Sequence, residues 1–259
     1  MSHNAWLQRL KAATLDAFAP CHCAVCSLPS GRPIELCAAC QAELPWMGPA
    51  CLQCALPLVG DQVICGQCLK REPAFDTVIA ACLFEQPVSG FVHGFKYHGQ
   101  FALLRLLGEL LAEAVAERLV IAEPPDYVLP MPLHWARRWQ RGFNQAALLA
   151  REIRKHPLLE GYDLPVDTRL CRRRRATPPQ RGADAGTRRR NLRNAMVAGA
   201  ELQGETVAVV DDVLTTGASA EAVASCLKAA GAGRVEIWCC ARTPAPSQQG
   251  GRRAGATMR

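Results

Sequence analysis

The stretch VAVVDDVLTTGAS, residues 207–219, contains the pattern that decides the fold. Its apolar start predicts a buried strand over residues 206–211, with Asp211 and Asp212 emerging at the carboxyl end. A helix is expected to begin near Ala218. Ligands of open α/β sheets bind at this edge of the sheet. The stretch therefore predicts a ligand site on a largely parallel α/β sheet.

The small, hydroxyl-rich turn that follows the two acids is suited to a phosphate group. Backbone N–H groups at a helix start favour an anion, and Gly217 lets the backbone approach it closely. The residues expected to form the 5′-phosphate loop are Val213, Leu214, Thr215, Thr216, Gly217, Ala218 and Ser219. The carboxylates suit the vicinal hydroxyls of a ribose, with a divalent cation. The alternative is an ordinary strand, turn and helix in which the acids merely cap the helix.

Four C-x-x-C pairs at regular spacing indicate metal binding near the amino end. Two pairs complete the tetrahedral four-thiolate shell of a structural zinc site, so one or two Zn²⁺ ions are expected. Sequential pairing of the knuckles is the simpler arrangement, and an interleaved one stays open. The proposed ligands are Cys23, Cys26, Cys37, Cys40, Cys51, Cys54, Cys65 and Cys68.

A disulfide framework is the alternative interpretation of these cysteines. We disfavour it because we find no secretory signal, and because the other six of the fourteen cysteines do not form such pairs. No stretch is long and apolar enough to span a membrane. We therefore expect a cytoplasmic protein with no membrane span.

The chain of 259 residues is expected to contain four parts. Residues 1–19 predict an amphipathic helix, residues 20–72 the zinc module, residues 73–242 the α/β domain, and residues 243–259 a disordered basic tail. Within the domain, strands are expected at 75–84, 127–133, 206–211 and 234–240, and helices at 101–119, 142–155 and 218–230. This alternation favours a parallel sheet covered on both faces.

Arginines gather at two places in the domain. Arg137, Arg138 and Arg141 follow the second predicted strand and surround the start of the next helix, which suits a pyrophosphate; a solvated basic face is the alternative. Residues 169–193 hold ten arginines and one acid, Asp184, with no aromatic residue among them. Within it, residues 172–190 are either a lid that closes over a ligand or a plain exposed loop.

These motifs together resemble known families. Residues 207–219 resemble the signature of type I phosphoribosyltransferases. RGFNQ at 141–145, FKYHG at 95–99 and RRRATPPQ at 173–180, together with the C-x-x-C pairs, resemble the ComF/GntX family of competence-associated phosphoribosyltransferase-like proteins. Gly182-Ala183 and Met196 depart from that family's pattern, where a leucine and an aromatic residue are common.

The resemblance implies binding of phosphoribosyl pyrophosphate with Mg²⁺ on a type I phosphoribosyltransferase fold. It implies catalytic roles for Asp211 and Asp212, with pyrophosphate held by Arg137, Arg138, Arg141, Lys96, Arg173 and Arg175. In related transferases a nucleophile, commonly a base nitrogen, displaces the pyrophosphate from C1 of the ribose.

Two classes of function follow from these expectations. The first is a phosphoribosyltransferase that acts in single-stranded DNA handling during natural transformation, with proteins of the DNA-uptake machinery as partners. The second is a non-catalytic zinc protein that keeps the fold and binds single-stranded DNA. Ten arginines in one segment predict DNA binding that weakens steeply with salt.

Overall fold

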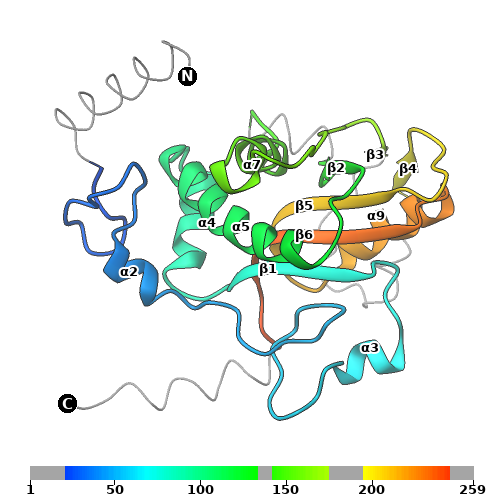
Figure 1. The fold of residues 1–259 in the computed structure, drawn as a ribbon, viewed down its shortest axis with the longest axis horizontal. Coiled ribbons are helices and arrows are strands. Elements are labelled where there is room, and N and C mark those ends of the chain that lie inside the picture. Colours follow the sequence, from blue (N-terminus) through cyan, green and yellow to red (C-terminus); the bar gives the residue numbers. More distant parts are fainter. Residues whose placement is uncertain (1–20, 134–141, 175–194, 246–259) are drawn as a thin grey trace.

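A computed structural model describes residues 21–133, 142–174 and 195–245. Its core is a four-stranded parallel sheet in the order β1-β6-β5-β2, formed by β1 (Thr77–Leu83), β6 (Arg234–Arg242), β5 (Thr206–Leu214) and β2 (Tyr127–Pro130) (Figure 1). The expected parallel α/β sheet is therefore confirmed.

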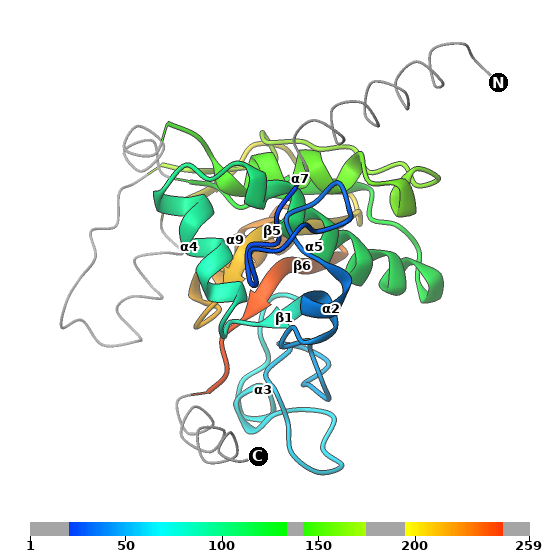
Figure 2. The same ribbon diagram turned by 90° about the vertical axis from the view of Figure 1, so that its left-hand side faces the viewer.

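Helices cover both faces of this sheet. Successive side chains of β5 point to opposite faces, so each face packs against a different set of helices. Ala208 and Val210 pack in one cluster with α4 (Val88–Tyr97), α5 (Ala102–Ile121), α7 (Gln145–Arg154) and the short 3-10 helix η1 (Pro157–Leu159). Val207 and Val209 pack in a second cluster with α9 (Ala218–Ala229). Figure 2 shows α4 beside the edge of the sheet at which β5 and β6 end.

Several boundaries differ from those expected. β5 continues to Leu214, because β6 is long enough to pair with it to the end, with Val213 opposite Ala241 and Leu214 opposite Arg242. β2 ends at Pro130, and α7 begins at Gln145, where the Asn144 side chain accepts a hydrogen bond from the Ala146 N–H at 3.1 Å.

Helix α4 and the two short strands β3 (Cys171–Arg173) and β4 (Met196–Ala198) were not predicted. Helix α4 follows β1, and its two glycines, Gly90 and Gly94, lower its helix propensity. Strand β3 pairs antiparallel with β4, so the start of the arginine-rich segment is a strand rather than a loop. Residues 175–194 lie outside the described residues, as do the predicted amino-terminal helix and most of the predicted tail.

The cysteine knuckles form two ribbons that repeat one local structure. In each, a tight turn joins the first C-x-x-C pair, and the second pair begins a short helix, α2 (Ala38–Ala42) or α3 (Gly66–Lys70), capped by Cys37 or Cys65. The ribbon with α2 packs into the cluster of α5, and the ribbon with α3 packs into the cluster of α9. The two ribbons therefore contribute to opposite sides of the domain core.

The linker between the ribbons covers the outer edge of β1. The Met47 N–H donates to the Ala81 carbonyl at 3.1 Å, and the Leu83 N–H donates to the Pro45 carbonyl at 2.7 Å. Trp46 pairs with Cys82 in an antiparallel bridge. An edge strand paired in this way no longer offers its backbone groups to another chain.

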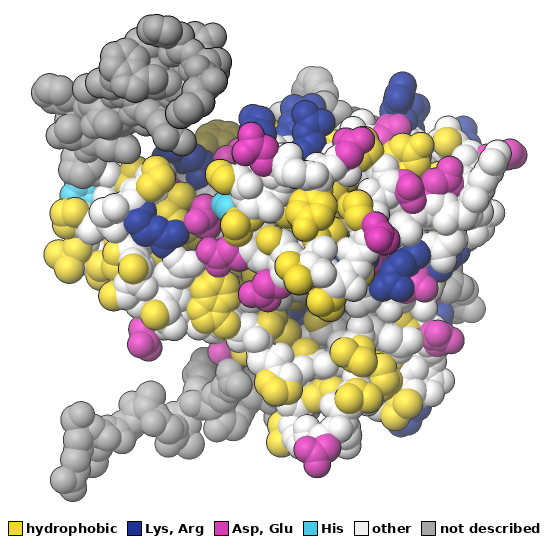
Figure 3. Space-filling model, in the orientation of Figure 1, with side chains coloured by type: hydrophobic (Ala, Val, Ile, Leu, Met, Phe, Trp, Pro, Cys, Tyr) yellow, Lys and Arg dark blue, Asp and Glu magenta, His cyan; other side chains and the backbone are white. Residues whose placement is uncertain are grey.

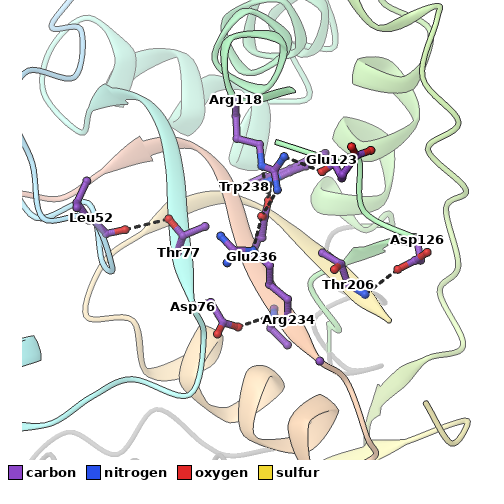
Figure 4. Close-up of polar contacts among 12 residues, drawn as sticks. Leu52, Asp76, Thr77, Arg118, Glu123, Asp126, Thr206, Arg234, Glu236 and Trp238 are labelled. Atoms are coloured by element: carbon purple, nitrogen blue, oxygen red, sulfur yellow. Dashed lines mark hydrogen bonds and ion pairs between the residues drawn. The ribbon is translucent and has the colours of Figure 1, made fainter. Parts of the chain in front are cut away.

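A buried carboxylate lies at the opposite end of the sheet from the predicted site. Glu236 is fully buried, and its oxygens accept hydrogen bonds from Arg118 Nε at 3.0 Å, Arg234 Nε at 2.9 Å and Trp238 Nε1 at 3.1 Å (Figure 4). Burial raises the pKa of Glu236, but these hydrogen bonds outweigh it and hold the pKa below its ordinary value. Glu236 thus ties the end of α5 to β6.

The ribbon with α3 also presents apolar surface to the solvent. Leu52, Val59, Val63 and Leu69 are all largely exposed. Hydrophobic side chains gather over this ribbon in the lower part of Figure 3. Patches of this kind mark interaction surfaces in soluble proteins.

Candidate functional site

The two predicted acids lie in the last part of β5, beside a lysine of α4. Lys96 Nζ is 2.8 Å from Asp212 Oδ1, and the Asp212 side chain is 7% exposed. The Asp212 N–H donates to Asp211 Oδ1 at 2.9 Å. The structure therefore brings Lys96 and both acids together, which sequence spacing alone did not predict. Lys96 contacts a carboxylate here, and its contact with a phosphate stays a prediction.

This arrangement changes the charge that the two acids carry. The pKa of Asp211 is raised to about 8, mainly by burial and next by the neighbouring Asp212 carboxylate, while Lys96 partly opposes both effects. A pKa of about 8 leaves the Asp211 carboxyl group mostly protonated at pH 7.

The turn after β5 is open to solvent. Thr215 and Thr216 are exposed, and Gly217 has φ 75°, a left-handed conformation that glycine adopts without strain. Gly217 is the N-cap of α9 and supplies no side chain to cap the helix, and Thr216 Oγ1 accepts only a long 3.4 Å hydrogen bond from the Ala218 N–H. Val213 and Leu214 are buried strand residues, so the turn consists of residues 215–217, and Ser219 lies in the first turn of α9.

Two buried side chains connect this turn to the ribbon with α3. Arg242 donates from Nε to the Cys54 carbonyl at 2.9 Å and from Nη1 to the Leu214 carbonyl at 3.0 Å, and Nη1 also contacts the Thr215 carbonyl. Glu221, in the first turn of α9, accepts from the Ala74 N–H at 2.9 Å and from Arg71 Nη2 at 3.2 Å. The ribbon with α3 is thus hydrogen-bonded, through these two side chains, to the turn and to the start of α9.

Sequence reasoning missed Arg242 and Glu221. Their signal was a charged residue in an otherwise apolar strand or helix, which is rare unless the charge is paired. Their partners lie far away in the sequence, so the pattern did not reveal what they contact.

A cavity lies beside the end of β2, the strand that pairs with β5. This cavity of about 530 Å³ is lined by Arg151, Arg169, Arg172 and Arg173 and by no acid among the described residues. Its floor includes Pro130, opposite Val210 in β5. Of the other arginines predicted to bind pyrophosphate, Arg137, Arg138, Arg141 and Arg175 lie outside the described residues.

The cysteines form two separate clusters, one of Cys23, Cys26, Cys37 and Cys40 and the other of Cys51, Cys54, Cys65 and Cys68. Within each cluster the sulfur atoms all lie within 4.8 Å of one another. The sulfurs of Cys26 and Cys37 are 3.9 Å apart, and those of Cys54 and Cys65 are 3.6 Å apart. A tetrahedral zinc with bonds of about 2.3 Å requires edges of about 3.8 Å. Both clusters therefore fit structural Zn²⁺, and the sequential pairing is confirmed.

The described residues contain no helix with the length and hydropathy that a membrane crossing requires. The fold and the site together define an α/β protein with two zinc ribbons and a carboxylate pair at the edge of its sheet. Residues 14–69 match the double zinc ribbon domain family.

Curated relatives identify the protein family. The chain is 34% identical over 212 residues to Competence protein F of Haemophilus influenzae, an alignment that covers 80% of this chain and 90% of the relative. It is 32% identical over 210 residues to DNA utilization protein YhgH of Escherichia coli K12, with the same coverage of 80% and 90%. The chain therefore belongs to the family of Competence protein F and DNA utilization protein YhgH.

Among solved structures, the chain is similar to a purine phosphoribosyltransferase from Pyrococcus horikoshii. The similarity has a TM-score of 0.33 at 20% identity and covers 54% of this chain and 73% of that chain.

Proposed function

We propose that this protein binds phosphoribosyl pyrophosphate with Mg²⁺ at the end of β5 and acts in the handling of single-stranded DNA. The observation that carries the proposal is one strand, turn and helix in which the carboxyl groups of Asp211 and Asp212, near the end of β5, precede a helix start at Gly217 that has no side-chain cap of its own. The names of the relatives from Haemophilus influenzae and Escherichia coli support the connection with DNA.

Each part of the ligand has a matching group. The backbone N–H groups of residues 215–219 would bind the 5′-phosphate, because the amino end of a helix favours an anion. Asp211 and Asp212 would accept hydrogen bonds from the ribose hydroxyls. Lys96 and Arg173 would bind the pyrophosphate, together with the predicted Arg137, Arg138, Arg141 and Arg175. Mg²⁺ would add positive charge at the pyrophosphate oxygens.

The same groups suit transfer of the phosphoribosyl group to an acceptor. The bond from C1 to the pyrophosphate oxygen breaks, the acceptor nucleophile forms the new bond, and positive charge develops on the ribose ring. The neighbouring carboxylates stabilise this charge, and the cationic side chains stabilise the departing pyrophosphate. The braced turn contributes by holding the 5′-phosphate in place while the reacting carbon is positioned.

Calorimetric titration of phosphoribosyl pyrophosphate with Mg²⁺ tests the proposal. Replacing both acids, Asp211→Asn with Asp212→Asn, is expected to weaken binding roughly a hundredfold, because both acidic acceptors are replaced by neutral amides that form weaker hydrogen bonds. Glu201→Gln, a change at an exposed acid away from the turn, should leave affinity unaltered. Equal heats from the double variant and the native protein would refute the proposal.

The alternative function is binding of single-stranded DNA without transferase activity. The cavity with four arginines and no acid among its described lining residues favours this function, because guanidinium groups bind phosphate oxygens. Replacing Arg169 and Arg172 with alanine should flatten the salt dependence of oligonucleotide binding by about 0.7 in slope for each phosphate that the protein no longer neutralises. Arg154→Ala, at an exposed position of α7 outside the cavity, is the matched control.

The two functions separate clearly in the Asp211→Asn, Asp212→Asn variant. A transferase that also binds DNA loses phosphoribosyl pyrophosphate binding in this variant and keeps its DNA affinity. A protein that only binds DNA shows no phosphoribosyl pyrophosphate binding in any form, native or variant.

A further inference from the structure

A cavity of about 610 Å³ lies along α4 and the segments on either side of it. The side chains that matter here are those of Gln86, His93, Lys96, Tyr97, His98 and Gln100. No Asp or Glu is among the described residues that line it. The lining therefore combines flat rings, carboxamides and one ammonium group.

Two glycines one helical turn apart let the carboxamides lie close to the helix. A Cβ at Gly90 would come within 3.2 Å of Gln86 Oε1, and a Cβ at Gly94 would clash with Gln100 Oε1. A carboxamide offers one acceptor and two donors in a plane, which is the pattern that pairs with the edge of a nucleobase. Gln86 and Gln100 thus place two such groups beside the same helix.

The rings form a partly exposed aromatic surface at the same cavity. The ring centroid of His93 is 4.8 Å from that of Tyr97 and 5.2 Å from that of His98, at interplanar angles of 45° and 52°. Tyr97 is 59% exposed. Exposed aromatic faces of this kind stack on bases whatever the sequence.

Lys96 connects this cavity to the carboxylates. It lines the cavity, and its ammonium group pairs with Asp212. A planar ligand in the cavity would consequently lie next to a pentose bound at the end of β5.

We propose that this cavity binds a nucleobase, stacked on the rings of His93 and Tyr97 and hydrogen-bonded by the carboxamides of Gln86 and Gln100. The proposal rests on the proposed function for the position of the pentose, but the binding of the base does not require it. The bound base is either a free base or the base of a mononucleotide, or it is one base of a single-stranded DNA.

The test measures three ligands on the full-length protein by fluorescence or calorimetric titration. They are a nucleoside monophosphate series, a short oligothymidylate, and an oligonucleotide of equal length with abasic sites in place of its bases. Tyr97→Leu is expected to weaken binding of base-containing ligands about tenfold. Phe101→Leu, at a neighbouring aromatic residue that is 52% exposed and does not line the cavity, should change affinity less than twofold.

Each result has a defined meaning. Weaker binding of mononucleotides in Tyr97→Leu supports a free base, and weaker binding of the oligothymidylate alone supports a DNA source. Equal affinity for the abasic strand and the oligothymidylate, together with unchanged mononucleotide binding in Tyr97→Leu, overturns the proposal, as does an equal effect of Tyr97→Leu and Phe101→Leu. Thermal melts of both variants verify that they fold.

Phosphoribosyl pyrophosphate carries no base, so its binding reports on the proposed function separately. We expect Tyr97→Leu to retain its affinity for this ligand within about twofold, since Tyr97 is not assigned a contact with the pentose or the phosphates. Failure of phosphoribosyl pyrophosphate to bind the native protein would remove the proposed function and leave the base-binding result standing.

Discussion

Replacing Arg242 with lysine tests whether the ribbon with α3 supports the turn of residues 215–217. Arg242 is 6% exposed and donates hydrogen bonds to the carbonyl groups of Cys54, Leu214 and Thr243 at 2.8–3.0 Å, with a further contact to Thr215. Lysine keeps the charge, but its single ammonium group does not reproduce the planar fork of the guanidinium group.

The size of the effect can be worked out from these hydrogen bonds. Lysine should fail to form at least two of the bonds to the carbonyl groups, and a hydrogen bond to a charged group contributes about 1.5–3 kcal/mol. We expect the free energy of unfolding to fall by about 3 kcal/mol. Affinity for phosphoribosyl pyrophosphate should fall roughly tenfold, because the turn is no longer held in place.

Urea denaturation followed by tryptophan fluorescence measures the first effect, and calorimetric titration measures the second. Arg234→Lys is the matched control on the same strand, because the Arg234 side chain is 47% exposed and its pairing should contribute less than about 1 kcal/mol. Equal losses of stability in the two variants, or unchanged ligand affinity in Arg242→Lys, would refute the reasoning.

Three further outcomes are expected. Glu236→Gln should lower the free energy of unfolding by about 3 kcal/mol at pH 7, because it breaks a buried ion pair. The pKa of Glu236 is lowered in the folded state, so this contribution is lost as pH falls through the folded-state pKa. Urea denaturation should therefore show the stabilities of the two proteins converging below about pH 4. The pKa of Asp211 is raised to about 8, so the folded state binds one more proton than the unfolded state between about pH 4 and 8. The free energy of unfolding of the native protein should therefore decrease as pH rises through this range, by up to about 1.4 kcal/mol per pH unit. Denaturation of Asp211→Asn across the same range should show a smaller slope, and an identical slope would contradict the assignment. Cys51→Ser should release one zinc ion and weaken phosphoribosyl pyrophosphate binding, whereas Cys23→Ser should release one zinc ion with little effect on binding, as zinc analysis and calorimetry of both variants would show.

Local signals in the sequence were sufficient to predict much of the fold. The four parallel strands, helices α5, α7 and α9 and the cysteine knuckles all follow from patterns within one segment: apolar runs, helical periodicity and C-x-x-C spacing. Helix α4 was missed because Gly90 and Gly94 lower helix propensity, and its apolar face is stabilised by packing against α5. The β3-β4 hairpin was missed because each strand is three residues long and its partner lies beyond the arginine-rich segment.

The sequence by itself determined the chemistry of the candidate site: two acids, a turn of small residues and eight paired cysteines, each recognisable because neighbours in the chain carry the pattern. The tertiary structure alone decided which knuckles share a cysteine cluster, that Lys96 pairs with Asp212, and that Arg242 connects a ribbon to the turn of residues 215–217. These contacts join residues far apart in the chain. Their geometry depends on how the sheet, helices and ribbons pack, and no local pattern encodes that packing.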